Sequence, residues 1–144
     1  METYLEIETL IKRIFNSFRH EVEAVLDKRL SGSEYRVLSL ISSGLAKTSD
    51  LAKTLDVSAS HITAITDTLV EEGLITRHRS KIDRRIIELR LTPEAESFVK
   101  EIDKKKKEMI IKRFAVFSEQ EQVEFRQLLK KLADGANKKN SQTP

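Results

Sequence analysis

The spacing of the apolar residues changes after Gly73, and this change constrains the fold more than any other feature of the 144-residue chain. Over residues 62–70, before the change, apolar positions recur every three or four residues, which is typical of one buried face of a helix. Over residues 86–91, after the change, apolar positions alternate with their neighbours, as in a half-buried strand. The sequence therefore predicts helices followed by a short strand pair.

Four helices are expected before Gly73, and their ends carry recognisable signals. They would cover about residues 3–27, 32–43, 48–55 and the segment from Ser58 to Gly73. Ser31 and Glu34 form a capping box, in which each side chain satisfies a backbone amide, and Ser58 is a good N-cap. Two short helices joined by the tight turn 55–58 and backed by a third form a helix-turn-helix.

Two more helices are expected after the strand pair. They would cover about residues 93–116 and 119–133. Thr92-Pro93-Glu94 supply an N-cap, a proline at the first helical position and an acid near the positive end of the helix dipole. Ser118 and Glu121 form a second capping box, and Gly135 is expected to end the last helix. The polar residues 137–144 are predicted to be disordered.

This order of elements predicts a mainly α fold with a small β-hairpin, a winged helix-turn-helix with helical extensions at both ends. The expected parts are one domain of residues 1–136, with a core of about 31–92 and dimerisation helices of about 3–27 and 93–134. Leu10, Phe15 and Leu26 widen the apolar stripe of the first helix beyond what one small neighbour would cover. The sequence therefore predicts a homodimer.

Positive charge is concentrated in one stretch of the chain. The net charge is only +3, but residues 77–90 hold six Lys or Arg and two Asp or Glu, so the remainder carries −1. A protein presents a phosphate-binding surface in this way while it stays near neutral elsewhere. The stretch coincides with the predicted loop between the strands, which favours a nucleic-acid partner.

Other classes of function find little support in the composition. Without cysteine, the chain has no disulfide, thiolate metal site or cysteine redox switch. The three histidines fall on different elements, so neither a metal, a cofactor nor a catalytic residue is predicted. No apolar run reaches about 18 residues and the N-terminus is acidic, so neither a membrane partner nor a signal peptide is expected. The predicted location is the cytoplasm.

Four short motifs carry a resemblance to a known family. They are Leu51-Ala52, the run from Glu72 to Arg77, Asp83-Arg84-Arg85 and Leu91-Thr92-Pro93. Together they resemble the MarR family of transcriptional regulators over about residues 30–95. The resemblance implies a repressor or activator, not an enzyme, whose affinity for DNA responds to a small molecule. Without cysteine, the chain cannot be one of the thiol-based peroxide sensors within that family.

The first two turns of the second helix of the pair would lie nearest the base edges in the major groove. Candidate residues there are Ser58, Ala59, Ser60, His61, Thr63 and Ala64, with Thr66 and Asp67 at the flank. Ser60, His61 and Thr63 are the candidates for polar contacts, although Ser60 could merely help to start the helix and Thr63 could be an ordinary surface residue. Many members of the resembling family carry arginine where Ala64 stands, which weakens the expectation of guanine readout.

The wing places five basic side chains within nine positions. They are Arg77, Arg79, Lys81, Arg84 and Arg85. The resemblance implies that Asp83 orients Arg85 into the minor groove, where a narrow A·T tract attracts arginine. The alternative is an ordinary surface ion pair, which contributes little. Weaker candidates for contacts to the DNA backbone are Arg36, Lys47 and Thr48, since isolated basic residues usually just face solvent.

The predicted partner is double-stranded DNA with a pseudo-palindromic site, whose half-sites lie one helical turn apart because the dimer is two-fold symmetric. An apolar or phenolic effector could contact Phe15, Phe18, Tyr35 or Phe114, although the same side chains serve equally well as core. Two rival functions remain open: a winged-helix module that binds proteins, and an architectural protein that binds DNA without sequence preference.

Overall fold

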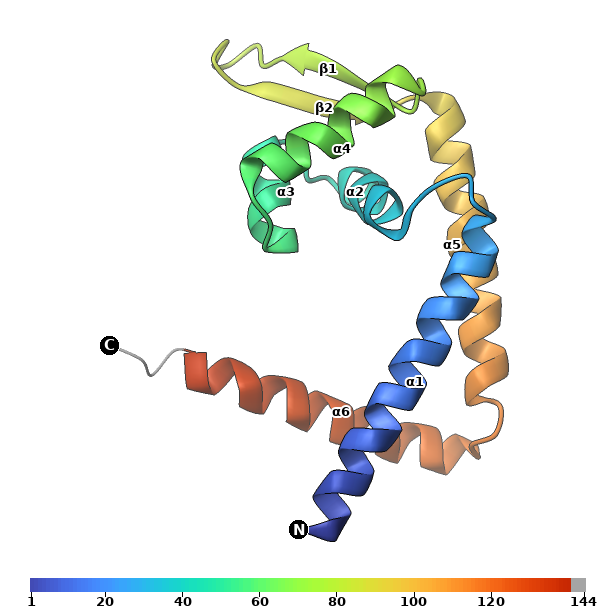
Figure 1. Ribbon diagram of the computed structural model, residues 1–144. Helices are drawn as coiled ribbons and strands as arrows, with labels where there is room; N and C mark the ends of the chain where they lie inside the picture. The colour runs from blue at the N-terminus through green and yellow to red at the C-terminus, as the bar shows by residue number, and fades with distance from the viewer. Residues whose placement is uncertain (141–144) are drawn as a thin grey trace. The chain divides into compact units, whose positions relative to one another are not determined.

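The structure, a computed structural model, describes residues 1–140, with side chains through residue 137. Within this range the chain is mostly helical with one two-stranded sheet (Figure 1). The elements are α1 (Glu2–Leu26), α2 (Gly32–Ser42), α3 (Thr48–Leu55), α4 (Ala59–Glu71), β1 (Ile75–Arg79), β2 (Ile87–Leu91), α5 (Pro93–Phe114) and α6 (Glu119–Asn140). The order and type of every predicted element are confirmed.

Contacts along the chain divide it into two compact units, Met1–Lys106 and Lys107–Pro144. The first unit contains α1 to α4, the hairpin and the first part of α5, and the second contains the end of α5 and α6. The single domain predicted for residues 1–136 stays a prediction.

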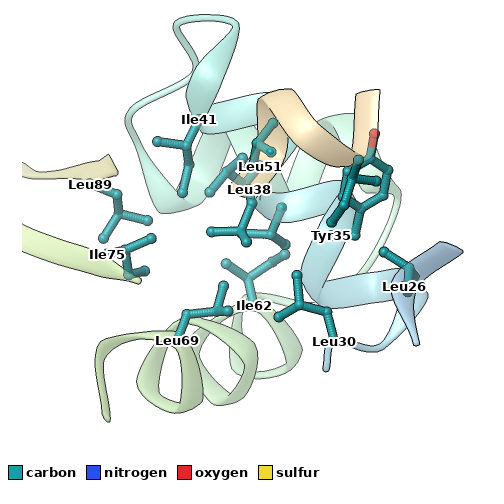
Figure 2. Close-up of a cluster of buried hydrophobic side chains, with 13 residues drawn as sticks. Leu26, Leu30, Tyr35, Leu38, Ile41, Leu51, Ile62, Leu69, Ile75 and Leu89 are labelled. Atoms are coloured by element: carbon teal, nitrogen blue, oxygen red, sulfur yellow. The ribbon is translucent and has the colours of Figure 1, made fainter. Parts of the chain in front are cut away.

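One hydrophobic core holds the first unit together. Side chains from α2, α3, α4 and both strands meet in it, and Figure 2 shows Ile75 and Leu89 of the hairpin pointing toward the helices. Leu38, Leu51 and Ile62 are completely buried. Each fully buried side chain of this size contributes about 1.5–3 kcal/mol relative to the exposed state. The core therefore fixes which face of α4 is left outside.

Local caps set the helix boundaries where the sequence predicts them. The Ser31 hydroxyl accepts a hydrogen bond from the Glu34 amide at 3.1 Å, and the Glu34 carboxylate accepts one from the Ser31 amide at 3.3 Å. After α4, Gly73 adopts a left-handed φ of 73°, and the following Leu74 amide donates to the Leu69 carbonyl at 2.9 Å. A left-handed residue is a common way to end a helix, and glycine adopts it without steric cost.

The two strands form an antiparallel hairpin whose base is packed and whose far end is not. Its register pairs Ile75 with Leu91 at the base and Arg79 with Ile87 at the other end. Leu89 is buried, and its amide donates to the Ala46 carbonyl at 2.7 Å, which attaches the hairpin to the segment before α3. The alternation over residues 86–91 places Ile87 on the same side as Leu89 and predicts that it is buried, but Ile87 is 41% exposed, because the hairpin extends beyond the core at that point.

Thr92 joins the end of the hairpin to the start of α5. Its hydroxyl accepts a hydrogen bond from the Ala95 amide at 3.3 Å and donates one to the Gly73 carbonyl at 2.9 Å. The predicted N-cap is confirmed, and one side chain connects α5 to the turn after α4.

The second unit is organised around three aromatic rings. The rings of Phe114, Phe117 and Phe125 pack against one another in tilted pairs, with ring centroids 5.4–6.0 Å apart. The predicted capping box is present, with the Ser118 hydroxyl accepting from the Glu121 amide at 3.2 Å and the Glu121 carboxylate accepting from the Ser118 amide at 3.1 Å.

The end of α6 corrects two predictions. The helix does not stop near Gly135 but continues to Asn140, so residues 137–140 are helical rather than disordered. One glycine inside a helix costs roughly 1 kcal/mol relative to alanine, which is too little to end a helix by itself. The rest of the predicted tail, residues 141–144, lies outside the described residues.

Candidate nucleic-acid interface

Helix α4 is held by its N-cap and by its buried face. The Ser58 hydroxyl accepts from the His61 amide at 3.1 Å, which confirms the predicted cap. Ile62 and Leu69 are buried against α2 and the hairpin, so the opposite face of the helix points to solvent. The exposed residues of the first two turns are Ser58, Ala59, Ser60, His61, Thr63 and Ala64. The structure brings all of these candidates together on one surface.

The hydroxyl groups on this surface already have partners within the helix. Ser60 Oγ lies 3.1 Å from Ser58 Oγ, and Thr63 Oγ1 donates to the Ala59 carbonyl at 2.9 Å. A hydroxyl oxygen that donates one hydrogen bond keeps lone pairs that accept others. Thr63 is therefore an exposed acceptor in this structure, and Ser60 is both a cap neighbour and an exposed polar group.

Thr66 does not belong to the exposed flank. It was predicted to face outward, but it is 0% exposed: its hydroxyl donates to the Thr63 carbonyl at 3.1 Å and accepts from Arg77 Nη2 at 3.2 Å. Because its polar atom is satisfied locally, threonine occupies this buried position without an unpaired hydroxyl.

Arg77 connects the wing to α4. Besides Thr66, its Nη2 atom donates to the carboxylate of Asp67, with which it forms an ion pair. Arg77 was predicted as one of the basic groups of the wing that contact DNA. In this structure its guanidinium points back to α4 and fixes the first strand relative to that helix.

The loop of the wing is built around Ser80, which was not among the residues predicted for this site. The Ser80 hydroxyl accepts from the amides of Ile82 and Asp83 at 3.2 and 3.3 Å, and the Ser80 amide donates to the Ile86 carbonyl at 2.9 Å. Arg79 Nη1 closes the other side by donating to the Arg84 carbonyl at 3.0 Å. The Ser80 hydroxyl reaches the Ile82 amide two residues on, which is the spacing of a serine turn, and a serine in this loop could have identified the motif. The loop therefore has a defined shape.

Asp83 and Arg85 form an ion pair at the tip of the wing, and the orienting role that the resemblance implies for Asp83 stays a prediction. Asp83 Oδ1 accepts from the Arg85 amide at 3.0 Å and from Arg85 Nε at 3.2 Å. The Arg85 side chain is 91% exposed, so the pair holds the guanidinium in solvent rather than against the protein. Arg79, Lys81 and Arg84 belong to the same hairpin, and Lys81 and Arg84 are exposed. Their shared positive charge attracts polyanions.

The weaker candidates for backbone contacts lie on neighbouring elements. Lys47 precedes α3 and forms an isolated antiparallel bridge with Glu88 of β2, so it lies beside the hairpin. Lys47 is exposed, and Thr48 is half-buried. Arg36 is exposed on α2.

The four candidates for an effector pocket are not alike. Tyr35 is buried in the core of the first unit, and its hydroxyl donates to the Asp103 carboxylate. Burial, together with this hydrogen bond, raises the pKa of Tyr35 above its usual value. Phe15 and Phe18 lie on α1, exposed and half-buried respectively, whereas Phe114 belongs to the aromatic cluster of the second unit.

Two other kinds of site find no counterpart among the described residues. Among the described residues, no three or more His, Cys, Asp or Glu side chains lie together in a group that could hold a metal ion. Among the helices that the structure describes, none is both long and apolar enough to cross a membrane.

The fold and this surface together define a winged helix-turn-helix protein with a cationic wing. The model of the MarR family matches residues 30–87. The Uncharacterized HTH-type transcriptional regulator YpoP of Bacillus subtilis (strain 168) is 42% identical over 128 residues, which are 88% of this chain and 91% of that protein. The chain therefore belongs to the MarR family, whose members are transcriptional regulators and not enzymes.

Two further comparisons agree with this assignment. The HTH-type transcriptional repressor MdtR of Bacillus subtilis (strain 168) is 27% identical over 133 residues, which are 91% of this chain and 86% of that protein. The crystal structure of Streptococcus pneumoniae FabT in complex with DNA superposes with a TM-score of 0.82 at 25% identity and covers 94% of this chain and 98% of FabT.

Proposed function

We propose that this chain is a dimeric repressor that binds a pseudo-palindromic site in double-stranded DNA in the cytoplasm. One observation carries the DNA-binding part of the proposal: the capped first turns of α4 and the cationic loop of the wing are exposed together and joined through Arg77. The helix would enter the major groove, and the wing would reach the adjacent minor groove. The similarity to a transcriptional repressor and to a protein crystallised in complex with DNA supports the same proposal.

In the proposed complex the contacts divide into two kinds. Ser60, His61 and Thr63 would meet base edges, whereas Lys81, Arg84 and the weaker candidates Arg36, Lys47 and Thr48 would meet phosphates. Arg85, held by Asp83, would enter the minor groove. Because Ala64 offers only a methyl group, it would contact a thymine methyl and not a guanine.

Exposed apolar side chains support the dimer. In the first unit they lie along α1, where Leu5, Ile11 and Phe15 are exposed, and in the second unit along α6, where Leu128 and Leu132 are exposed. Monomeric proteins rarely leave apolar surface of this extent in contact with water. A two-fold dimer would cover these faces and present two copies of α4 to half-sites one helical turn apart.

Control by a small molecule stays a prediction that rests on the resemblance. Of the four residues predicted to contact the small molecule, Phe114 lines an apolar cavity of about 380 Å³ in the second unit, together with Ile110, Phe125 and Leu129. Cavities of this size hold small ligands in other proteins. Tyr35 is the weakest candidate, because its ring and its hydroxyl are both engaged in the core of the first unit.

The experiment is a selection of bound duplexes from a random pool, followed by titration of the selected and a scrambled duplex at two salt concentrations. A specific regulator should prefer the selected duplex by about 10³-fold or more. Equal affinity for both duplexes with a steep salt dependence would instead indicate architectural binding. The absence of binding to either duplex would favour a module that binds proteins.

A further inference from the structure

Ile82 stands at the tip of the wing with its side chain 99% exposed. Its backbone is held in place, because the Ile82 amide donates to the Ser80 hydroxyl and the next amide, of Asp83, donates to the same oxygen. A branched apolar side chain at this position contributes nothing to the core and is disfavoured by water. The fold therefore presents one methyl-rich group at a defined place, on the loop that also carries Arg85.

The neighbours of Ile82 separate it from the other exposed apolar residues. On α1 and α6 such residues follow one another along a helix, as expected for faces that a second copy covers. Ile82 has Lys81 before it and Asp83-Arg84-Arg85 after it, with Lys81, Arg84 and Arg85 exposed. Protein interfaces are centred on clusters of large apolar side chains with few charges. A single apolar tip among cations fits a narrow polyanionic groove better than a protein surface.

We propose that Ile82 enters the minor groove of DNA beside Arg85 and packs against the sugars and base edges that form its walls and floor. The proposal rests on the DNA-binding function proposed above and assigns a further contact residue within it. The minor groove is about 6 Å wide, and proteins that bind there frequently insert apolar side chains, isoleucine among them. In this arrangement Arg85 supplies charge, and Ile82 excludes water from the same groove.

An apolar contact in the minor groove also predicts a preference among base pairs. A G·C pair places the guanine 2-amino group on the groove floor, whereas an A·T pair leaves the floor open. An isoleucine pressed into the groove meets that amino group and cannot satisfy its hydrogen bonds. Ile82 therefore favours A·T under the tip of the wing through shape and desolvation, without a hydrogen bond of its own.

The first test measures affinity and salt dependence together. Dissociation constants for the duplex selected by the wild-type chain are measured by fluorescence anisotropy at four salt concentrations for Ile82→Ser, Ile82→Val and Lys81→Gln. Ile82→Ser should bind roughly tenfold more weakly because less apolar area is buried. Its slope of log affinity against log salt should stay that of the wild type, and Ile82→Val should bind within about threefold of the wild type. Lys81→Gln should make the slope shallower by about 0.9 for each phosphate that the variant no longer neutralises.

The second test changes only the minor groove. Inosine replaces guanine in a G·C pair placed under the wing tip, which removes the 2-amino group and leaves the major-groove acceptors in place. The wild-type chain should bind the inosine duplex more tightly than the guanine duplex, and Ile82→Ser should lose part of this difference. Thermal unfolding of Ile82→Ser should match that of the wild type, because the side chain is fully exposed.

Three results would overturn the proposal. Tight, specific binding by the wild-type chain with equal affinity for Ile82→Ser would overturn this inference alone and leave the DNA-binding function standing. A loss of affinity in Ile82→Ser accompanied by a shallower salt slope would mean that the change acts on phosphate contacts. Failure of the wild-type chain to prefer any duplex would overturn both the inference and the function on which it rests.

Discussion

Asp83→Ala should weaken DNA binding only while Arg85 is present. Asp83 Oδ1 accepts from the Arg85 amide at 3.0 Å and from Arg85 Nε at 3.2 Å, so the carboxylate holds both the backbone and the guanidinium. The Arg85 side chain is 91% exposed, and exposed ion pairs contribute about 0–1 kcal/mol to stability. The free energy of unfolding should therefore change by less than about 1 kcal/mol in Asp83→Ala and in Arg85→Ala.

The effect on DNA binding should be larger, because in the proposed complex the Arg85 guanidinium would lie in the minor groove. Removal of a well-placed arginine costs about 1–3 kcal/mol, and a dimer loses it at both wings, so Arg85→Ala should bind roughly 30-fold or more weakly. With Asp83→Ala the arginine remains but must be ordered on binding, which costs about 0.5–1 kcal/mol at each wing. Asp83→Ala should therefore bind about five- to thirtyfold more weakly.

The assay is a double-mutant cycle on the selected duplex, with dissociation constants measured by anisotropy for the wild type, both single variants and the double variant. In the Arg85→Ala background, Asp83→Ala should be neutral or should slightly tighten binding, because it removes a carboxylate near phosphates. An equal loss in both backgrounds would refute the orienting role, because Asp83 would then act through the loop backbone. Tighter binding of Asp83→Ala in the wild-type background would show that Asp83 and Arg85 form an ordinary surface ion pair and that Asp83 does not orient Arg85.

Three further predictions follow from contacts in the structure. Asp67→Asn should weaken duplex binding in the same direction as Arg77→Ala, because both release the wing from α4; unchanged or tighter binding by Asp67→Asn in anisotropy titrations would show that Arg77 contacts DNA instead. Tyr35 has a raised pKa, so its contribution to stability is complete below the usual tyrosine pKa of 10.0 and is lost as the pH rises through the raised pKa. In urea unfolding from pH 8 to 11, the free energy of unfolding of Tyr35→Phe should therefore fall less than that of the wild type. Equal decreases in the two proteins would contradict this prediction. Leu132→Glu places a charge at a residue that is 66% exposed in the single chain, so each protomer should stay folded. If α6 lies in the dimer interface, the buried charge should shift sedimentation equilibrium toward monomer. An unchanged dimer would show that α6 is not part of the interface.

The features predicted correctly from the sequence are those that depend on neighbouring residues. Ser31 with Glu34, Ser58 and Thr92 each cap a helix through a backbone amide at most three residues away, so the residue pattern alone identifies them. The change from helical to strand spacing after Gly73 likewise reflects which side chains face one core.

The features that were missed depend on residues distant in sequence, or on a balance of small energies. Thr66 looks like a surface residue by type, but its partner Arg77 lies eleven residues away on β1. The same contact turns Arg77 from the expected DNA surface toward α4. Ile87 fits the alternation of a strand, but only the three-dimensional extent of the core shows that the hairpin has left it. At Gly135 the helical preference of the surrounding residues outweighs the glycine penalty.

Hydroxyl-radical footprinting of the selected duplex tests most directly whether each protomer of a dimer binds DNA with its α4 helix and its wing. The proposed dimer predicts two protected half-sites related by two-fold symmetry, with centres about 10 base pairs apart, each flanked by protected minor-groove sugars that become reactive in Arg85→Ala. A single asymmetric protected site, or weak protection spread evenly along the duplex, would contradict the proposed mode of binding.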